Sequence, residues 1–77
     1  MITPAQCRAA RGLLDWTQQQ LADKARVGVV TIRQLEAGVG TPRWATVDVI
    51  QRAFELAGVQ FIHADDVGAG VLLRKPP

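Results

Sequence analysis

Serine, asparagine and tyrosine are absent from this sequence of 77 residues, and cysteine and histidine occur once each, as Cys7 and His63. Without serine there is no serine nucleophile, and a single cysteine cannot close a disulfide within the chain. One cysteine and one histidine also fall short of the four ligands of a structural zinc site. We therefore expect no metal, no cofactor and no catalytic site, and we interpret the chain as a protein that is not an enzyme.

Long apolar runs are missing too, since none approaches the ~20 residues that a helix needs to span a membrane. The first residues lack the charged and apolar regions of a signal peptide, so we expect a cytoplasmic protein with no membrane contact. A chain this short buries only about 60% of the surface that its unfolded form exposes. With neither disulfide nor metal to compensate, a second copy of the chain is the expected source of additional stability.

The net charge of +2 is small, and the pI of 9.3 says little about partners. With one histidine and no tyrosine, almost nothing titrates between roughly pH 5 and 9, so a small excess of arginine raises the pI. The local distribution is more informative, because from Lys24 to Arg43 four basic residues accompany one acidic residue, Glu36. Such a patch is an ordinary solvated surface unless the fold presents it to nucleic acid.

Capping signals predict where two helices begin. Thr3 and Gln6 have the spacing of a capping box and Pro4 suits the first helical position, so a helix is expected over residues 4–14. Thr17 and Gln20 repeat the capping-box spacing and open a second helix. Both helices carry apolar side chains on one face: Cys7, Ala10 and Leu14 in the first, and Leu21, Ala22 and Ala25 in the second.

Two further helices follow from apolar spacing. A third helix carries Ile32 and Leu35 inward and ends at Gly38, a residue type favoured just beyond a helix. Thr46 is expected to cap a fourth helix, which ends at Gly58. The apolar stripe of this helix is formed by Val47, Ile50, Phe54 and Ala57.

The last nineteen residues have a different pattern. Residues 59–63 and 71–74 are short, apolar and rich in β-branched side chains, which predicts two strands joined by a turn-rich segment. Apolar side chains occur on both faces, as at Phe61 and Ile62, and a lone pair of strands is marginally stable in water. We therefore divide the chain into a helical domain, 1–58, and a β-strand tail, 59–77. The pattern leaves open whether the strands pair within one chain or between two.

The segment from Thr17 to Glu36 has the spacing of a helix-turn-helix. Two helices that cross at a steep angle with a short turn need small and apolar residues at defined positions. The small Ala22 matters most, because a larger side chain would hold the second helix away from the first. The full set comprises Leu21, Ala22, Ala25, Val27, Ile32 and Leu35.

The motifs of this segment resemble those of the Xre/Cro/phage-repressor family of transcriptional regulators, over residues 4 to 58. The resemblance rests on Trp16-Thr17-Gln18, Leu21-Ala22, Val27, Thr31-Ile32, Glu36, Gly38 and Thr41-Pro42. It implies a mainly α, lambda repressor-like bundle of four to five short helices, here followed by a short two-stranded β element. The third helix of such a bundle enters the major groove of double-stranded DNA. Two positions depart from the family pattern, Arg26 where glycine is usual and Gly28 where serine or threonine is favoured.

The resemblance also implies site residues. The candidates for base contacts are Gly28, Val29, Val30, Thr31, Arg33 and Gln34, on the first turns of the third helix. Valine methyls suit the thymine methyl, arginine suits guanine, and glutamine suits adenine. The candidates for contacts with the DNA backbone are Thr17, Gln18, Arg26 and Arg43. Arg11 and Glu36 match an ion pair of the family.

One module of this size buries too little DNA surface for selective binding alone, so we expect a homodimer on a two-fold operator, acting as a repressor. The candidate residues for the dimer interface are Phe61, Ile62, Val71 and Leu73. An alternative is an antitoxin or adaptor whose C-terminal strands bind a different protein, such as a toxin.

Overall fold

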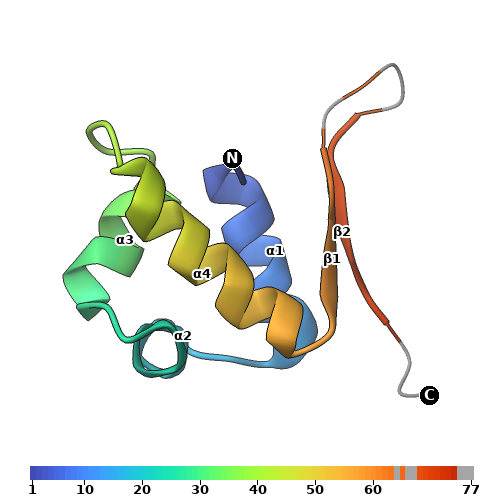
Figure 1. Cartoon of the computed structure of the whole chain (residues 1–77), viewed down its shortest axis with the longest axis horizontal. Helices are drawn as coiled ribbons and strands as arrows, with labels where there is room; N and C mark the ends of the chain where they lie inside the picture. The colour runs from blue at the N-terminus through green and yellow to red at the C-terminus, as the bar shows by residue number, and fades with distance from the viewer. Residues whose placement is uncertain (64, 66–67, 75–77) are drawn as a thin grey trace.

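The computed structural model describes residues 1–63, 65 and 68–74, so part of the connection between the strands and the last three residues of the predicted tail lie outside it. Four helices are followed by a two-stranded sheet within this described part (Figure 1). The elements are α1 (Pro4–Leu14), α2 (Gln18–Ala25), α3 (Val29–Ala37), α4 (Trp44–Leu56), β1 (Val59–Ile62) and β2 (Gly70–Leu73). The prediction of a mainly α fold with a short β element is confirmed.

Both predicted capping boxes are present. The hydroxyl oxygen of Thr3 accepts from the N–H of Gln6 at 3.1 Å, and the Gln6 side chain accepts from the N–H of Thr3 at 2.9 Å. Thr17 and Gln20 make the same reciprocal pair at 3.0 and 2.8 Å. Each box satisfies two backbone donors that a helix start otherwise leaves unpaired, so α1 and α2 begin where the sequence predicts.

Three helices end on a left-handed residue. Gly38, with φ of 71°, ends α3 as predicted. Asp15 and Arg26 end α1 and α2 with φ of 55° and 57°, and both are non-glycine residues. This conformation costs a residue with a side chain about 1 kcal/mol. Arg26 therefore adopts with strain the left-handed conformation that glycine adopts freely.

The predicted start of the fourth helix is wrong by three residues, since the N-cap is Arg43 and not Thr46. Helix α4 begins at Trp44, and its N-cap is Arg43, which makes no side-chain capping hydrogen bond. The N–H of Val47 donates to the carbonyl of Arg43 at 3.1 Å, so the first turn closes before Thr46. Thr46 consequently lies inside the helix, where its side chain is not needed as a cap.

The strands pair within one chain as an antiparallel hairpin, which answers the question that the sequence left open. Val59 pairs with Leu73, and Ile62 pairs with Gly70. The N–H of Arg74 extends the ladder by donating to the carbonyl of Gly58 at 2.9 Å. Since the hairpin also packs on α1 and α4, it has the cover that a lone hairpin lacks.

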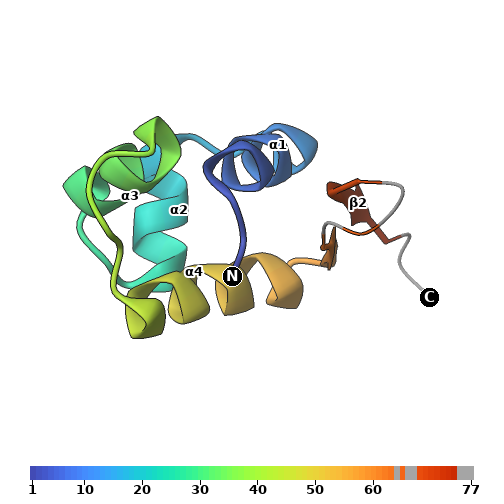
Figure 2. The ribbon, with the colours of Figure 1, turned by 90° about the horizontal axis from the view of Figure 1, so that it is seen from above.

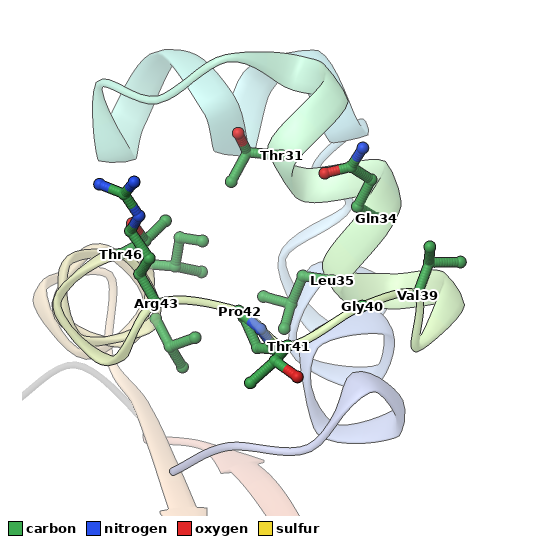
Figure 3. Close-up of a pocket in the computed structure, with 11 residues that line it drawn as sticks. Thr31, Gln34, Leu35, Val39, Gly40, Thr41, Pro42, Arg43 and Thr46 are labelled. Atoms are coloured by element: carbon green, nitrogen blue, oxygen red, sulfur yellow. The ribbon is translucent and has the colours of Figure 1, made fainter.

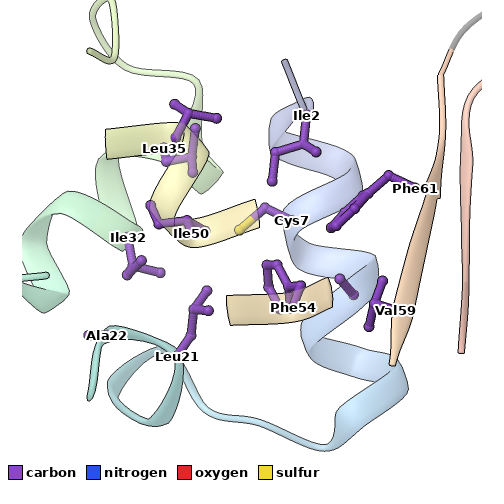
Figure 4. Close-up of a cluster of buried hydrophobic side chains, with 12 residues drawn as sticks. Ile2, Cys7, Leu21, Ala22, Ile32, Leu35, Ile50, Phe54, Val59 and Phe61 are labelled. Atoms are coloured by element: carbon purple, nitrogen blue, oxygen red, sulfur yellow. The ribbon is translucent and has the colours of Figure 1, made fainter. Parts of the chain in front are cut away.

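One core joins the helices and the hairpin (Figure 4). The ring of Phe54 stacks against Trp16 and meets Phe61 edge-on, with ring centroids 5.8 Å apart in both pairs. Val59 and Phe61 from β1 are buried in the same cluster as the helical residues, so the helical domain and the tail share a core. The largest fully buried side chains are Phe54, Leu21, Ile32, Ile50, Val47 and Cys7.

The arrangement separates α3 from the hairpin. Helix α3 packs on α1 and α2, whereas the strands pack on α1 and α4. As a result α3 and the hairpin lie on opposite sides of the molecule (Figures 1 and 2). No helix among the described residues is long and apolar enough to cross a membrane.

Candidate nucleic-acid interface

Helix α3 has one buried face and one open face. Ile32 and Leu35 are buried, as the sequence predicts, and so is Glu36. On the opposite side Val30 is 57% exposed, which is costly for an apolar side chain that serves no core. Arg33 and Gln34 flank it in the open. The outer surface of α3 therefore combines a methyl-bearing, a cationic and an amide side chain.

The other three candidates for base contacts form the start of α3. Gly28 is the N-cap and is exposed, and an added Cβ there would meet nothing within 4 Å. Val29 and Thr31 are half-buried, and Val29 packs partly against the core cluster. Val29 thus has a structural role that the sequence did not predict, whereas Gly28 leaves the first turn of α3 open to approach.

The turn that orients α3 depends on Ala22. This residue is fully buried between α2 and α3, and its carbonyl accepts from the N–H of Val27 at 3.0 Å. The left-handed Arg26 completes the reversal of the chain and leaves its own side chain exposed. A larger side chain at Ala22 would push the two helices apart.

Exposed polar residues surround α3. Thr17 caps α2, Arg26 lies in the turn, and Arg43 caps α4, so each stands at the end of a helix adjoining α3. Lys24 differs, because its Nζ lies over the Trp16 ring, 5.8 Å from the centroid. The exposed arginines on α3 or at the neighbouring helix ends are therefore Arg26, Arg33 and Arg43.

Glu36 anchors α3 to α1 through a buried carboxylate. Arg11 donates to it bidentately, with Nε 2.6 Å from Oε2 and Nη2 2.8 Å from Oε1. Gln18 Nε2 donates to Oε1 at 3.1 Å, and Cys7 Sγ donates to Oε2 at 3.4 Å. Arg8 donates to the Glu36 backbone carbonyl. The structure brings Arg11 and Glu36 together, as the resemblance implied. The same carboxylate also binds the side chain of Gln18, which was a candidate for contact with the DNA backbone.

This network sets the charges in the core. Burial by itself raises the pKa of Glu36, but hydrogen bonds from Arg11, Gln18 and Cys7 outweigh it and hold that pKa below its ordinary 4.5. The hydrogen bond to Glu36 raises the pKa of Arg11. Burial, followed by the Glu36 charge, raises the pKa of the Cys7 thiol to about 12. Cys7 is therefore a neutral hydrogen-bond donor and not a reactive thiolate.

A hollow of about 420 Å³ lies between α3 and the segment leading into α4 (Figure 3). Thr31 and Gln34 line it from α3, while Arg43 and Thr46 line it from the start of α4. Thr46, which the sequence suggested only as a helix cap, thus joins this polar surface. No local pattern could have revealed this, because the two walls of the hollow come from different helices.

The dimer candidates lie on the far side of the molecule. Phe61 is only 8% exposed and packs against Phe54, so it serves the chain's own core and is not available to a partner. Val71 is half-buried, whereas Ile62 and Leu73 are about two-fifths exposed, at 40% and 41%. No group of three or more His, Cys, Asp or Glu side chains that could hold a metal ion occurs in the described ranges.

Two short helices joined by a tight turn, the second with an open face surrounded by arginines, define a helix-turn-helix DNA-binding domain. A family model described as "Helix-turn-helix" matches residues 8–61. The chain belongs to this family, the Xre/lambda repressor-like helix-turn-helix proteins, which are DNA-binding transcription regulators. No curated protein matches the chain.

Proposed function

We propose that this protein is a repressor that binds a two-fold operator as a homodimer, with α3 in the major groove of each half-site. The observation that carries the proposal is the open face of α3, where Val30, Arg33 and Gln34 stand opposite the buried Ile32 and Leu35. An exposed valine has no role in the fold, but its methyl groups suit the C5-methyl of thymine. Repression follows most simply from occlusion of a promoter.

The remaining contacts divide into readout and positioning. Arg33 suits the O6 and N7 atoms of guanine, and Gln34 suits the N6 and N7 atoms of adenine. Arg26 and Arg43 meet phosphates, which fix the register of the protein on the duplex without reading sequence. The backbone N–H groups at the start of α2, beside Thr17, also donate to phosphates.

A two-fold assembly supports selectivity. A single module buries roughly 600–1,000 Å² on DNA, whereas selective binding among genomic competitors needs more. Two copies on half-sites about one helical turn apart, ~34 Å, double the contacts and impose a symmetric operator.

Selection of bound DNA from a random pool tests the proposal. We expect a selected sequence with inverted half-sites, and loss of enrichment with Arg33→Ala. Arg74→Ala, which also removes an exposed arginine but lies beside the hairpin on the side away from α3, is the matched control and should select the same sequence. Enrichment of no motif above background would contradict specific DNA binding, and enrichment of a single unpaired half-site would contradict the two-fold assembly.

A second candidate function is an antitoxin or adaptor role in which the hairpin binds a different protein. The observation that favours it is the exposed apolar surface of Ile62, Leu72 and Leu73, on the side of the molecule away from α3. A partner on that side leaves the DNA-reading face free. Stoichiometric co-purification of one protein that is lost with Ile62→Lys would support this role, and its persistence in that variant would contradict it.

A further inference from the structure

The outer face of α4 is apolar at both ends and charged in the middle. Trp44 and Leu56 stand at the two ends of the helix and are 69% and 91% exposed. Between them Arg52 Nε lies 3.0 Å from Asp48 Oδ2, in an ion pair whose arginine is exposed and whose aspartate is half-buried. These four residues are spaced four positions apart, so they form one continuous row of side chains, here called the α4 ridge.

The α4 ridge is complementary to itself. Its order along the helix is apolar, acidic, basic, apolar. A second identical helix can lie antiparallel on this ridge, with the two-fold axis on the outer side of the helix, level with position 50. Trp44 then faces Leu56 of the partner subunit. In the same register Asp48 faces Arg52 of the partner subunit. A two-fold interface requires this reciprocity, in which each residue meets its complement twice.

A shallow hollow adjoins each end of the ridge. One is lined by Trp44 together with Met1, Val47, Asp48 and Gln51, and the other by Leu56 together with Asp48, Arg52 and Glu55. In the antiparallel register the first hollow receives Leu56 of the partner subunit and the second receives Trp44 of the partner subunit. Large apolar side chains that enter hollows on the facing helix are the usual means by which helices pack.

We infer that a second copy of this chain docks on the α4 ridge. The inference rests on the two-fold assembly of the proposed function and names the surface that forms it. Charge complementarity selects this occupant, because the acidic and basic positions of the ridge match each other under a two-fold axis. The hairpin, in contrast, has no acidic or basic residue within Val59–Ile62 or Gly70–Leu73.

Docking on the α4 ridge does not involve α3. Helix α4 runs along one side of the bundle, with α1 and α3 on the other side (Figure 2). A copy docked on the ridge therefore leaves the open face of α3 uncovered. A helix of 13 residues is only about 20 Å long, so the contact is smaller than the ~800 Å² per partner of a standard interface. We expect a dimer that dissociates in the micromolar range and that the operator stabilises.

A charge-swap experiment tests the inference. Asp48→Lys and Arg52→Glu each place like charges opposite one another in the homodimer, and each should weaken dimerisation about tenfold or more by sedimentation equilibrium. An equimolar mixture of the two variants should recover a heterodimer. In that mixture the substituted position 48 of one chain faces the substituted position 52 of the other with opposite charge, while Arg52 of the first faces Asp48 of the second.

The design separates dimerisation from folding. Both variants lose the ion pair within their own chain, so recovery in the mixture can arise only between chains. Thermal melts check that each variant folds. Ile62→Lys on the hairpin is the matched control, and this variant should dimerise as strongly as the wild type.

Three outcomes would overturn the inference: a wild-type chain that stays monomeric at millimolar concentration, a mixture that does not recover, or dissociation by Ile62→Lys in place of the ridge variants. Failure of the proposed function is distinguishable from these. Binding of the monomeric variants to a single half-site tests α3 alone. If neither the variants nor the wild type bound DNA, DNA binding would be rejected. The recovery of the heterodimer in the mixture would not be affected by that result.

Discussion

The side-chain amide of Gln6 donates a hydrogen bond to the backbone carbonyl of Ile62 across 56 positions of sequence, with Nε2 and the oxygen 2.9 Å apart. The same nitrogen donates to the carbonyl of Gly70 at 3.1 Å, on the neighbouring strand. The carbonyl end of this side chain completes the capping box with Thr3. One buried residue therefore starts α1 and attaches both strands of the hairpin to it.

This double role predicts a large effect of Gln6→Ala on stability. The substitution removes one hydrogen bond from each of two strand carbonyls, and it also removes half of a capping box. Gln20→Ala is the matched control, because it removes half of the α2 capping box and touches no strand. We expect the loss in free energy of unfolding for Gln6→Ala to exceed that for Gln20→Ala by about 1–3 kcal/mol in urea titrations. Equal losses would show that the bonds to the hairpin contribute nothing.

Glu36→Gln should destabilise the protein by about 3 kcal/mol. The change removes the charge that pairs with Arg11, and breaking a buried ion pair from one side typically costs 3–5 kcal/mol. We take the lower end because the Arg11 side chain is 22% exposed. The control is Glu55→Gln, which makes the same substitution at an exposed glutamate. It should shift the free energy of unfolding by less than about 0.5 kcal/mol. Similar effects of the two substitutions would contradict this account.

Stability should fall in acid because of Glu36. Its pKa lies below 4.5 in the folded protein, so the folded state binds the proton less readily than the unfolded state does. The stabilisation by the carboxylate is therefore complete above about pH 4.5 and is lost as the pH falls through the folded pKa. Urea titrations between pH 2.5 and 6 should show this loss in the wild type and a flatter profile in Glu36→Gln. Parallel profiles would assign the acid sensitivity to other carboxylates.

Arg33 and Arg43 should differ in what they contribute to DNA binding. Arg33→Ala should cost about 1–3 kcal/mol on the selected operator and relax the preference for one base. Arg43→Ala should weaken binding to all sequences alike and reduce the slope of log affinity against log salt by about 1. Fluorescence anisotropy on matched and mismatched duplexes at several salt concentrations measures both effects. An Arg33→Ala variant with unchanged base preference would remove Arg33 from the readout.

Arg26→Gly should stabilise the fold and weaken DNA binding at once. Glycine adopts the left-handed conformation without strain, so a gain of up to about 1 kcal/mol in the free energy of unfolding is expected. Loss of the guanidinium should reduce affinity for DNA at low salt. Asp15→Gly is the matched control, because it relieves the same strain at the end of α1 and carries no cation. A loss of DNA affinity in Asp15→Gly as large as in Arg26→Gly would argue against a phosphate contact by Arg26.

The sequence by itself determined the helix starts at Thr3 and Thr17 and the end of α3 at Gly38. Each depends on hydrogen bonds between residues three to five positions apart, or on a backbone conformation that glycine favours, so a short window contains all the information. The start of α4 was missed for the same reason, because Arg43 makes no side-chain cap and leaves no local signal. The open face of α3 was also predictable, since helical spacing assigns Ile32 and Leu35 to the buried side.

Only the tertiary structure decided the rest. Phe61 has the same apolar character as Ile62, yet packing places one against Phe54 and leaves the other exposed. The attachment of the hairpin by Gln6 spans more than fifty positions, and the hollow beside α3 has walls from two helices. Such contacts depend on which surfaces meet when the chain closes on itself, and the free energy of that packing is shared by the whole core. Spacing along the chain therefore predicted the helices, while their assembly determined which side chains remain exposed.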